Sequence, residues 1–307
     1  FAWGADELNP ISKTPLTSDV CGGIGVMIFD SLDTLYITGM HTEFNEAKAW
    51  VKNSTFNINT NVVVFEVTIR ALGGLLSAYA LTQDNLFKDK AVELADRLMP
   101  AFSNLPSNRI NLRDGSRFGV KNFCVAEVGS LQLEFAYLSY LTGNKQYLRV
   151  VCRSESYLMR FARKARPKYL LSSTINMRGD MFGPKSVGAC IDSYYEYLIK
   201  QWIQSGRRKK WLLNFYENTT HAISKYLIRR IHNITMVVAL NLPQMEMSHL
   251  DCFLPGMFAL GVYTNPTSKF ANRDMSIAKG LTDSCWKMYS LSKTSGAESI
   301  RMSQKEY

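Results

Sequence analysis

Helical segments that begin with an acidic residue recur about every sixty residues along this chain. The acids are Glu66, Glu127 and Asp192, each preceded by an apolar or small residue. They are 61 and 65 residues apart, and 57 further residues lead to His249. Apolar residues return at intervals of three and four within three segments, residues 68–81, 127–141 and 192–203. This repeat length fits one inner helix, one outer helix and their loops.

Repeated helical hairpins can close into a ring whose inner helices direct one end towards a shared cavity. In such a ring Glu66, Glu127, Asp192 and His249 converge from four different hairpins. An acid at a helix N-terminus is also favoured by the helix dipole, which accounts for any one of these acids alone. Because the dipole does not account for their apolar neighbours, the sequence predicts a shared polar cavity.

The remaining pattern is also helical. Two further stretches have helical periodicity, residues 253–260 and 277–291, whereas β-rich runs are limited to residues 61–65 and 236–240. Gly143 and Gly206 follow two of the helices as C-terminal stops. The sequence therefore predicts a mainly α-helical protein.

Composition indicates a packed globular protein, because 46% of the 307 residues are apolar and 20% are charged. No uninterrupted apolar run reaches the ~20 residues of a membrane span. The chain opens on Phe1 without a basic and apolar leader, so we expect any targeting or anchoring segment to precede it in a longer product.

The net charge of +10 raises the question of nucleic-acid binding. The excess cations are scattered, with local clusters at residues 163–168 and 207–210. No basic stripe with interleaved aromatics and no nucleic-acid-binding motif accompanies them, so we expect no nucleic-acid partner. The clusters are interpreted as solvated loops and helix ends.

The six cysteines form no CxxC pair and do not alternate with histidines at ligand spacing, so no zinc site is expected. Three glycosylation sequons begin at Asn53, Asn218 and Asn233. Together with a cysteine pair discussed below, they favour a secretory compartment.

Several carboxylates around one cavity suit glycoside hydrolysis, in which one acid protonates the leaving oxygen and another activates water or attacks the anomeric carbon. Asp192 and Glu196 are four residues apart, so they share one face of a helix. Glu66 and Arg70 repeat that spacing, and the guanidinium could pair with the acid or bind two sugar hydroxyls. Spacing alone does not distinguish a sugar from another polyol or a peptide.

The chain resembles glycoside hydrolase family 47, the class I α-1,2-mannosidases that trim N-glycans. The residues of its motifs are most similar to those of the Golgi type. The resemblance runs almost from end to end, in the order AWGADELNPISK at residues 2–13, DSLDTL at 30–35, TEFNEAKAW at 42–50, VFEVTIR at 64–70, GGLLSAY at 73–79, AE at 126–127 with LEF at 133–135, DSYYEYL at 192–198, and HL at 249–250 with CF at 252–253.

This resemblance implies a single catalytic domain over residues 1–307, an all-α (α/α)7 barrel or toroid that is incomplete in this chain. It implies an inverting hydrolase of terminal α-1,2-linked mannose on high-mannose N-glycans, with a calcium ion. Glu66 matches the general-acid candidate, which can act through a water, and Asp192 matches the second catalytic carboxylate. Four residues match positions that bind the mannose, namely Arg70, Glu127, Glu196 and His249.

The sequence also departs from the family pattern. The family's candidate base lies in an Arg-Pro-Glu motif and its calcium-binding threonine in a Thr-Glu-Ala-His-Pro motif, and neither motif occurs in these residues. We therefore expect no metal ligand in this chain and very poor hydrolysis by it alone. Cys190 stands where the endoplasmic-reticulum type has arginine and the Golgi type leucine, which favours a Golgi-like enzyme in the secretory lumen.

The alternative is a mannose-binding relative of the same fold that does not hydrolyse its ligand and serves glycoprotein quality control. The family's bridge between two matching helices implies a disulfide between Cys252 and Cys285, which favours the enzyme branch. Their Cα atoms are expected within ~7 Å of each other.

Overall fold

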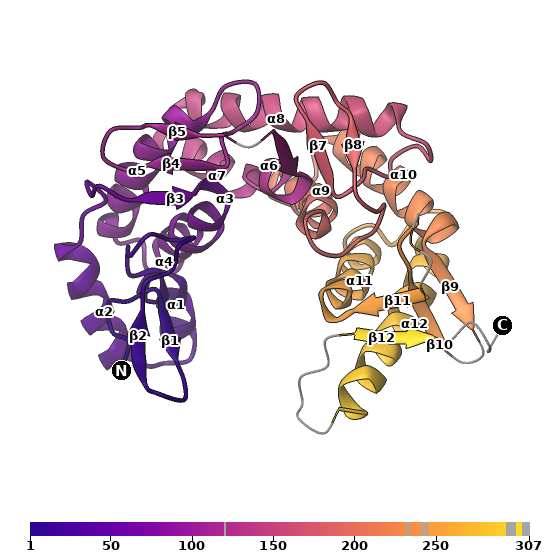
Figure 1. The fold of residues 1–307 in the computed structure, drawn as a ribbon, viewed down its shortest axis with the longest axis horizontal. Coiled ribbons are helices and arrows are strands. Elements are labelled where there is room, and N and C mark those ends of the chain that lie inside the picture. Colours follow the sequence, from indigo (N-terminus) through magenta and orange to yellow (C-terminus); the bar gives the residue numbers. More distant parts are fainter. Residues whose placement is uncertain (120, 232–233, 241, 243–244, 293–298, 303–307) are drawn as a thin grey trace. The chain divides into compact units, whose positions relative to one another are not determined.

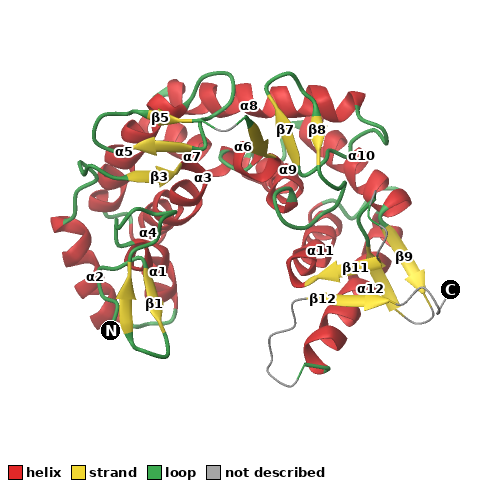
Figure 2. Ribbon diagram, viewed as in Figure 1, coloured by secondary structure: helices red, strands yellow, loops and turns green. Residues whose placement is uncertain are grey.

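The computed structural model describes residues 1–307 except 120, 232–233, 241, 243–244, 293–298 and 303–307. The described chain divides into two compact units (Figure 1). The first unit comprises Phe1–Lys121 with Ser130–Glu155, and the second comprises Asn122–Gly129 with Ser156–Tyr307. Helices dominate both units, as the sequence predicts (Figure 2).

The first unit consists of helices joined by short loops and two small antiparallel sheets, β1–β2 and β3–β4–β5. Its helices are α1 (Val26–Ile37), α2 (His41–Asn53), α3 (Val64–Val67), a π-helical turn (Thr68–Leu72), α4 (Gly73–Thr82), α5 (Asn85–Leu98), a 3₁₀ turn (Met99–Ala101), α7 (Gln132–Thr142) and the first part of α8 (Lys145–Lys164). Its strands are β1 (Glu7–Asn9), β2 (Thr14–Leu16), β3 (Asn61–Val63), β4 (Arg109–Asn111) and β5 (Arg117–Phe118).

Helices α1 and α4 pack unusually closely in the core of the first unit. A Cβ atom added to Gly74 of α4 would lie 2.0 Å from the backbone oxygen of Phe29 in α1. The Phe29 ring is fully buried and contacts Phe56, with the ring centroids 5.2 Å apart. The absence of a side chain at Gly74 therefore allows α4 to lie directly on the α1 backbone.

We expect Gly74→Ala to lower the free energy of unfolding by about 2–3 kcal/mol, because the added methyl group overlaps a backbone oxygen that cannot move aside cheaply. Gly256→Ala in α11 is the matched control, since a Cβ there meets no atom within 4 Å. That change should leave the free energy unaltered or raise it by about 0.5–1 kcal/mol. Urea denaturation of both variants provides the measurement, and equal effects would contradict the close-packing account.

The second unit contains three small antiparallel sheets, β6–β7–β8, β9–β10 and β11–β12. Its helices are α6 (Val125–Gly129), the end of α8, α9 (Asp192–Gln204), α10 (Lys210–Tyr226), a 3₁₀ turn η3 (His249–Phe253), α11 (Leu254–Thr264) and α12 (Ala271–Ser290). Its strands are β6 (Asn122–Cys124), β7 (Thr174–Asn176), β8 (Met181–Phe182), β9 (Ile228–Ile231), β10 (Ile234–Val237), β11 (Met245–Ser248) and β12 (Ser299–Met302).

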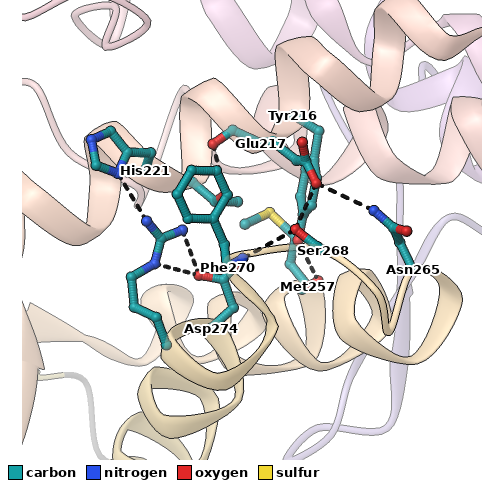
Figure 3. Close-up of polar contacts among 10 residues, drawn as sticks. Tyr216, Glu217, His221, Met257, Asn265, Ser268, Phe270 and Asp274 are labelled. Carbon is teal, nitrogen blue, oxygen red and sulfur yellow. Dashed lines mark hydrogen bonds and ion pairs between the residues drawn. The ribbon is translucent and has the colours of Figure 1, made fainter.

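Polar contacts connect α10 to α11, to α12 and to the loop between them (Figure 3). The Tyr216 hydroxyl donates to the backbone oxygen of Met257 over 3.1 Å. Glu217 accepts hydrogen bonds from Asn265 and Ser268, at 3.2 and 2.7 Å. These contacts fix α10 relative to the chain that follows it within the second unit.

The predicted disulfide between Cys252 and Cys285 is confirmed, with the Cα atoms 6.0 Å apart. It joins η3 to α12, which are otherwise separated by the whole of α11. A second disulfide, between Cys124 and Cys190, was not predicted.

Most predicted helices are present with small shifts at their ends. The segment predicted at 192–203 is α9, and Gly143 and Gly206 both adopt the positive φ of a C-terminal stop. The segment predicted at 127–141 is interrupted between α6 and α7, so it is not one helix. An all-α description is also incomplete, because the described residues include five small sheets whose strands are too short to show an alternating pattern.

The sequons and the longest apolar helix can also be placed. Asn53 and Asn218 are exposed, whereas Asn233 lies outside the described residues. Among the described helices, the continuous run Val64–Thr82 is long and apolar enough to cross a membrane. The sequence did not indicate this run, because polar residues interrupt its apolar ones. About half of this run is buried inside the protein, and it carries Glu66 and Arg70, so it gives no clear membrane span.

Candidate active site

A polar pocket of about 230 Å³ opens in the first unit beside the start of α1 and the α3–π-helical segment. Its lining includes Glu66, Arg70, Asp30 and the buried thiol of Cys21. Burial, and secondarily the charge of Asp6, raises the pKa of Cys21 to about 11, so the thiol is neutral in this pocket.

Arg70 connects two carboxylates at this pocket. Its Nε donates to Glu66 Oε2 over 2.9 Å, and its Nη1 lies 3.5 Å from Asp30 Oδ2. The predicted proximity of Glu66 and Arg70 is therefore confirmed. Asp30 is the first residue of the DSLDTL motif, and the sequence did not predict its place beside Arg70. Burial alone lowers the pKa of Arg70, but its hydrogen bond to Glu66 and the two negative charges outweigh burial and raise it. Arg70 is a permanent cation with two anionic neighbours.

Asp6 fixes the start of α1 next to this pocket. Its carboxylate, only 3% exposed, accepts backbone N–H groups from four residues, namely Ser18, Gly23, Gly25 and Val26. Gly25 is the N-cap of α1, with a left-handed φ of 77°. Asp6 therefore caps the helix that carries Asp30.

In the second unit, Asp192 is the first residue of α9. Its backbone N–H donates to Gly188, and its Oδ1 accepts the N–H of Ser193 over 2.8 Å. Burial is the main cause that raises the pKa of Asp192 above its ordinary value, and repulsion from Glu196 adds to it. Burial thus contributes more to the raised pKa of Asp192 than the like charge of Glu196 does.

The unpredicted disulfide brings the segments of Glu127 and Asp192 together. Cys124 ends β6, directly before the helix that carries Glu127, and Cys190 lies in the turn before Asp192. Ala126 also donates its N–H to the backbone oxygen of Cys190 over 2.9 Å. The sulfur of Cys190 is bonded to that of Cys124, and the residue is only partly buried.

Glu196 and His249 occupy different surroundings. Glu196 accepts a hydrogen bond from Lys200 at 2.5 Å, one helical turn further along α9. His249 is exposed and begins η3. The structure thus places Glu196 in an ion pair that the sequence reasoning did not include.

Asp251 is a site candidate that sequence reasoning missed. It is 7% exposed and accepts hydrogen bonds from the Ser248 backbone and hydroxyl, at 2.7 and 3.2 Å. Burial, with a smaller contribution from the charge of Asp192, raises the pKa of Asp251 to about 6. A Cβ on Gly188 would lie 2.9 Å from Asp251 Oδ1, so this carboxyl packs on the turn that begins α9. The sequence did contain one indication of this site, because Asp251 lies between Leu250 and Cys252 of the motif that was matched to the family.

The raised pKa of Asp251 predicts a specific pH dependence of stability. The Asp251 carboxyl binds its proton more tightly in the folded protein than in the unfolded chain. Protonation of Asp251 therefore stabilises the folded state below about pH 4, and this contribution is lost as the pH rises through about 6. We expect Asp251→Asn to gain about 2 kcal/mol relative to the parent between pH 4 and pH 7. Urea denaturation across this range measures the difference, with exposed Asp89→Asn as control. A difference independent of pH would contradict the prediction.

The candidate residues thus fall into two groups. Glu66 and Arg70 belong to the first unit, whereas Glu127, Asp192, Glu196 and His249 belong to the second. Convergence of both groups on one cavity stays a prediction.

The described side chains do not form an evident metal site. No group of three or more His, Cys, Asp or Glu residues that could hold a metal ion occurs within the described part of the chain. In the first-unit pocket, Asp6 is occupied by backbone N–H groups, and Glu66 and Asp30 face Arg70. Calcium needs six to eight oxygen ligands, so these carboxylates do not fit a calcium cage.

A protein-family model described as glycosyl hydrolase family 47 matches residues 1–306. The chain belongs to glycoside hydrolase family 47. The family assignment drawn from the motifs is therefore confirmed.

Two proteins named as 1,2-α-mannosidases are similar to almost the whole chain. The endoplasmic reticulum mannosyl-oligosaccharide 1,2-alpha-mannosidase of Rattus norvegicus is 40% identical over 302 residues, covering 94% of the chain and 45% of the relative. The mannosyl-oligosaccharide alpha-1,2-mannosidase IA of Drosophila melanogaster is 36% identical over 325 residues, covering 99% and 48%. The chain spans about half the length of these relatives.

A solved structure, the alpha-1,2-mannosidase from Trichoderma reesei, has the same fold. It matches with a TM-score of 0.87 and 26% identity, covering 97% of the chain and 66% of that structure. The helical fold of this family 47 chain is thereby established.

Proposed function

We propose that this family 47 chain supplies acid and sugar-binding groups for hydrolysis of terminal α-1,2-linked mannose on high-mannose N-glycans. The observation that carries the proposal is the first-unit pocket, in which Arg70 joins Glu66 and Asp30. Relatives at 36–40% identity are named 1,2-α-mannosidases, which supports the same substrate class.

Glu66 is proposed as the proton donor to the leaving oxygen, directly or through a water. Asp192 is proposed as the second catalytic carboxylate, and its raised pKa lets it hold a proton at a higher pH than an ordinary Asp. Arg70, Glu127, Glu196 and His249 are proposed to bind the mannose hydroxyls. Hydrolysis with inversion releases β-mannose, and it requires the working carboxylates to be ~6.5–9.5 Å apart with a water between.

The calcium ion and the complete barrel are implied by the family resemblance, and the described side chains do not form a calcium site. The described carboxylates do not fit calcium, so the roles proposed here are proton transfer and sugar binding by side chains. We propose that the described helices form part of an (α/α)7 barrel that these residues do not complete.

A location in the secretory lumen is supported by two disulfides and by relatives that include an endoplasmic-reticulum enzyme. Within that pathway we favour the Golgi type, because Cys190 replaces the arginine of the endoplasmic-reticulum type.

Sugar binding by the chain tests the proposal without requiring turnover. We expect calorimetric titration to show binding of α-1,2-mannobiose and none of maltose. Arg70→Met should weaken binding about 10–100-fold, since hydrogen bonds from a charged group contribute about 1.5–3 kcal/mol. Arg113→Met, at an exposed arginine outside the pocket lining, is the control. Equal binding of maltose, or no effect of Arg70→Met, would refute the proposed pocket.

A further inference from the structure

Two basic segments that are about forty residues apart in the sequence lie together in the second unit. One ends α8, and the other leads into α10, which passes close to it (Figure 1). Phe215 of α10 connects them: its ring centroid is 5.4 Å from the Arg163 guanidinium and 5.2 Å from the Tyr169 ring. Lys210 precedes Phe215 by five residues, roughly 8 Å along the helix axis.

We call the resulting patch the basic surface. It comprises Arg163, Lys164, Arg166, Lys168, Arg207, Arg208 and Lys210, all of them exposed. None of the seven forms an ion pair with a carboxylate in the part of the chain that the structure describes. No Asp or Glu occurs in residues 157–179 or 197–216, so neighbouring sequence does not neutralise it. These seven cations, without carboxylate partners among the described residues, make the end of α8 and the approach to α10 strongly positive.

Helix stability accounts for only part of this surface. Arg163 and Lys164 lie in the last turn of α8, where the helix dipole favours cations. Lys210 is the first residue of α10, and the first turn of α10 contains no acid. Cations at that end are opposed by the dipole, so Arg207, Arg208 and Lys210 are not explained as helix-stabilising residues.

The side chains indicate the chemistry of a partner. Four of the seven are arginines, whose planar guanidinium groups bind the paired oxygens of sulfate or phosphate groups. Trp211 follows Lys210 and is 46% exposed, which offers a flat apolar face beside the cations. Indole faces stack on sugar rings, and Lys/Arg-rich segments are typical of heparin-binding surfaces. Sulfate-binding cations beside an exposed aromatic fit a sulfated sugar chain better than a lipid surface.

We propose that the basic surface binds a sulfated polysaccharide of the glycosaminoglycan type. This binding is independent of the mannosidase proposal, because none of its residues lines the first-unit pocket or belongs to the candidate site. It also gives the two clusters a role beyond that of solvated loops and helix ends.

The test measures binding of a short fluorescent heparin oligosaccharide by anisotropy between about 0.05 and 0.2 M NaCl, since binding to a polyanion weakens with salt. Two triple variants remove separate halves of the surface, Lys164→Gln with Arg166→Gln and Lys168→Gln, and Arg207→Gln with Arg208→Gln and Lys210→Gln. The control removes the same charge from exposed lysines of the first unit, Lys52→Gln with Lys121→Gln and Lys145→Gln. Circular dichroism confirms that each variant is folded.

We expect each surface variant to weaken heparin binding by about 10-fold or more and to reduce its salt dependence, with the control close to the parent. Desulfated heparin should bind at least about 10-fold more weakly than heparin, because the sulfates carry most of the charge. Equal losses in the control variant would show a net-charge effect and overturn the proposal. Equal or tighter binding of phosphatidylserine vesicles or of single-stranded DNA would overturn it as well.

Discussion

We expect the 307 residues alone to release mannose from a high-mannose glycan about 10²–10⁴-fold more slowly than the rat relative in the same assay. Inversion requires a base that activates water opposite the leaving group, and one acid or base contributes about 10²–10⁴-fold. The family resemblance places this base in an Arg-Pro-Glu motif that does not occur in these residues. Glu66 and Asp192 therefore lack their expected partner when the chain acts alone.

A fusion protein distinguishes two explanations for slow hydrolysis, the absence of the catalytic base and an incorrect assignment of Glu66 and Asp192. The chain is joined to the part of the rat relative that lies beyond its match, and we expect mannose release to rise about 10²-fold or more. In that fusion, Glu66→Gln and Asp192→Asn should each remove the gain, whereas exposed Asp89→Asn should not. Turnover by the chain alone at the rate of the rat relative would show that Glu66 and Asp192 suffice and that the role assigned to the missing base is wrong.

Periodicity predicted the helices best where local chemistry agrees with packing. The 192–203 segment was located within one residue of α9, because a 3.6-residue apolar pattern ends at a glycine that adopts positive φ. The proximity of Glu66 and Arg70 followed from their spacing of four residues, which the helical backbone converts directly into a contact. Features within one helix are thus readable from the sequence.

Features that depend on contacts across the chain were not readable in the same way. Cys124 and Cys190 are 66 residues apart, and nothing in their spacing identifies them as partners. The strands contain two to four residues, too few for an alternating pattern to distinguish them from loops. Asp251 looks like a surface acid until its burial against Gly188 is seen. The burial of Asp251 depends on tertiary packing, which no local sequence pattern records.

The N-terminal motif WGADEL shows how one side chain can connect fold and site. Asp6 accepts four N–H groups from residues that are 12 to 20 positions further along the chain, in the loop before α1 and at the first residue of α1. Helix α1 in turn carries Asp30, which contacts Arg70 at the pocket. The motif that identified the family therefore has a structural reason. Oδ1 of Asp6 accepts the N–H groups of Gly25 and Val26 at a helix start that has no capping side chain of its own, and Oδ2 accepts those of Ser18 and Gly23 in the preceding loop.

We expect Asp6→Ala to lower the free energy of unfolding by at least about 4 kcal/mol, because four buried or partly buried donors lose their acceptor at about 1–3 kcal/mol each. Asp6→Asn retains one acceptor oxygen and presents an amide N–H₂ to the other donors, so its loss should be smaller, about 2 kcal/mol. Asp19→Ala, an exposed acid in the same loop, is the control and should change the free energy by less than about 0.5 kcal/mol. Urea denaturation measures the free energy of unfolding of the three variants.

Because α1 positions Asp30 beside Arg70, Asp6→Ala should also weaken mannobiose binding under conditions where the variant is still folded. A variant as stable as the Asp19→Ala control would show that water replaces the Asp6 carboxylate at the start of α1.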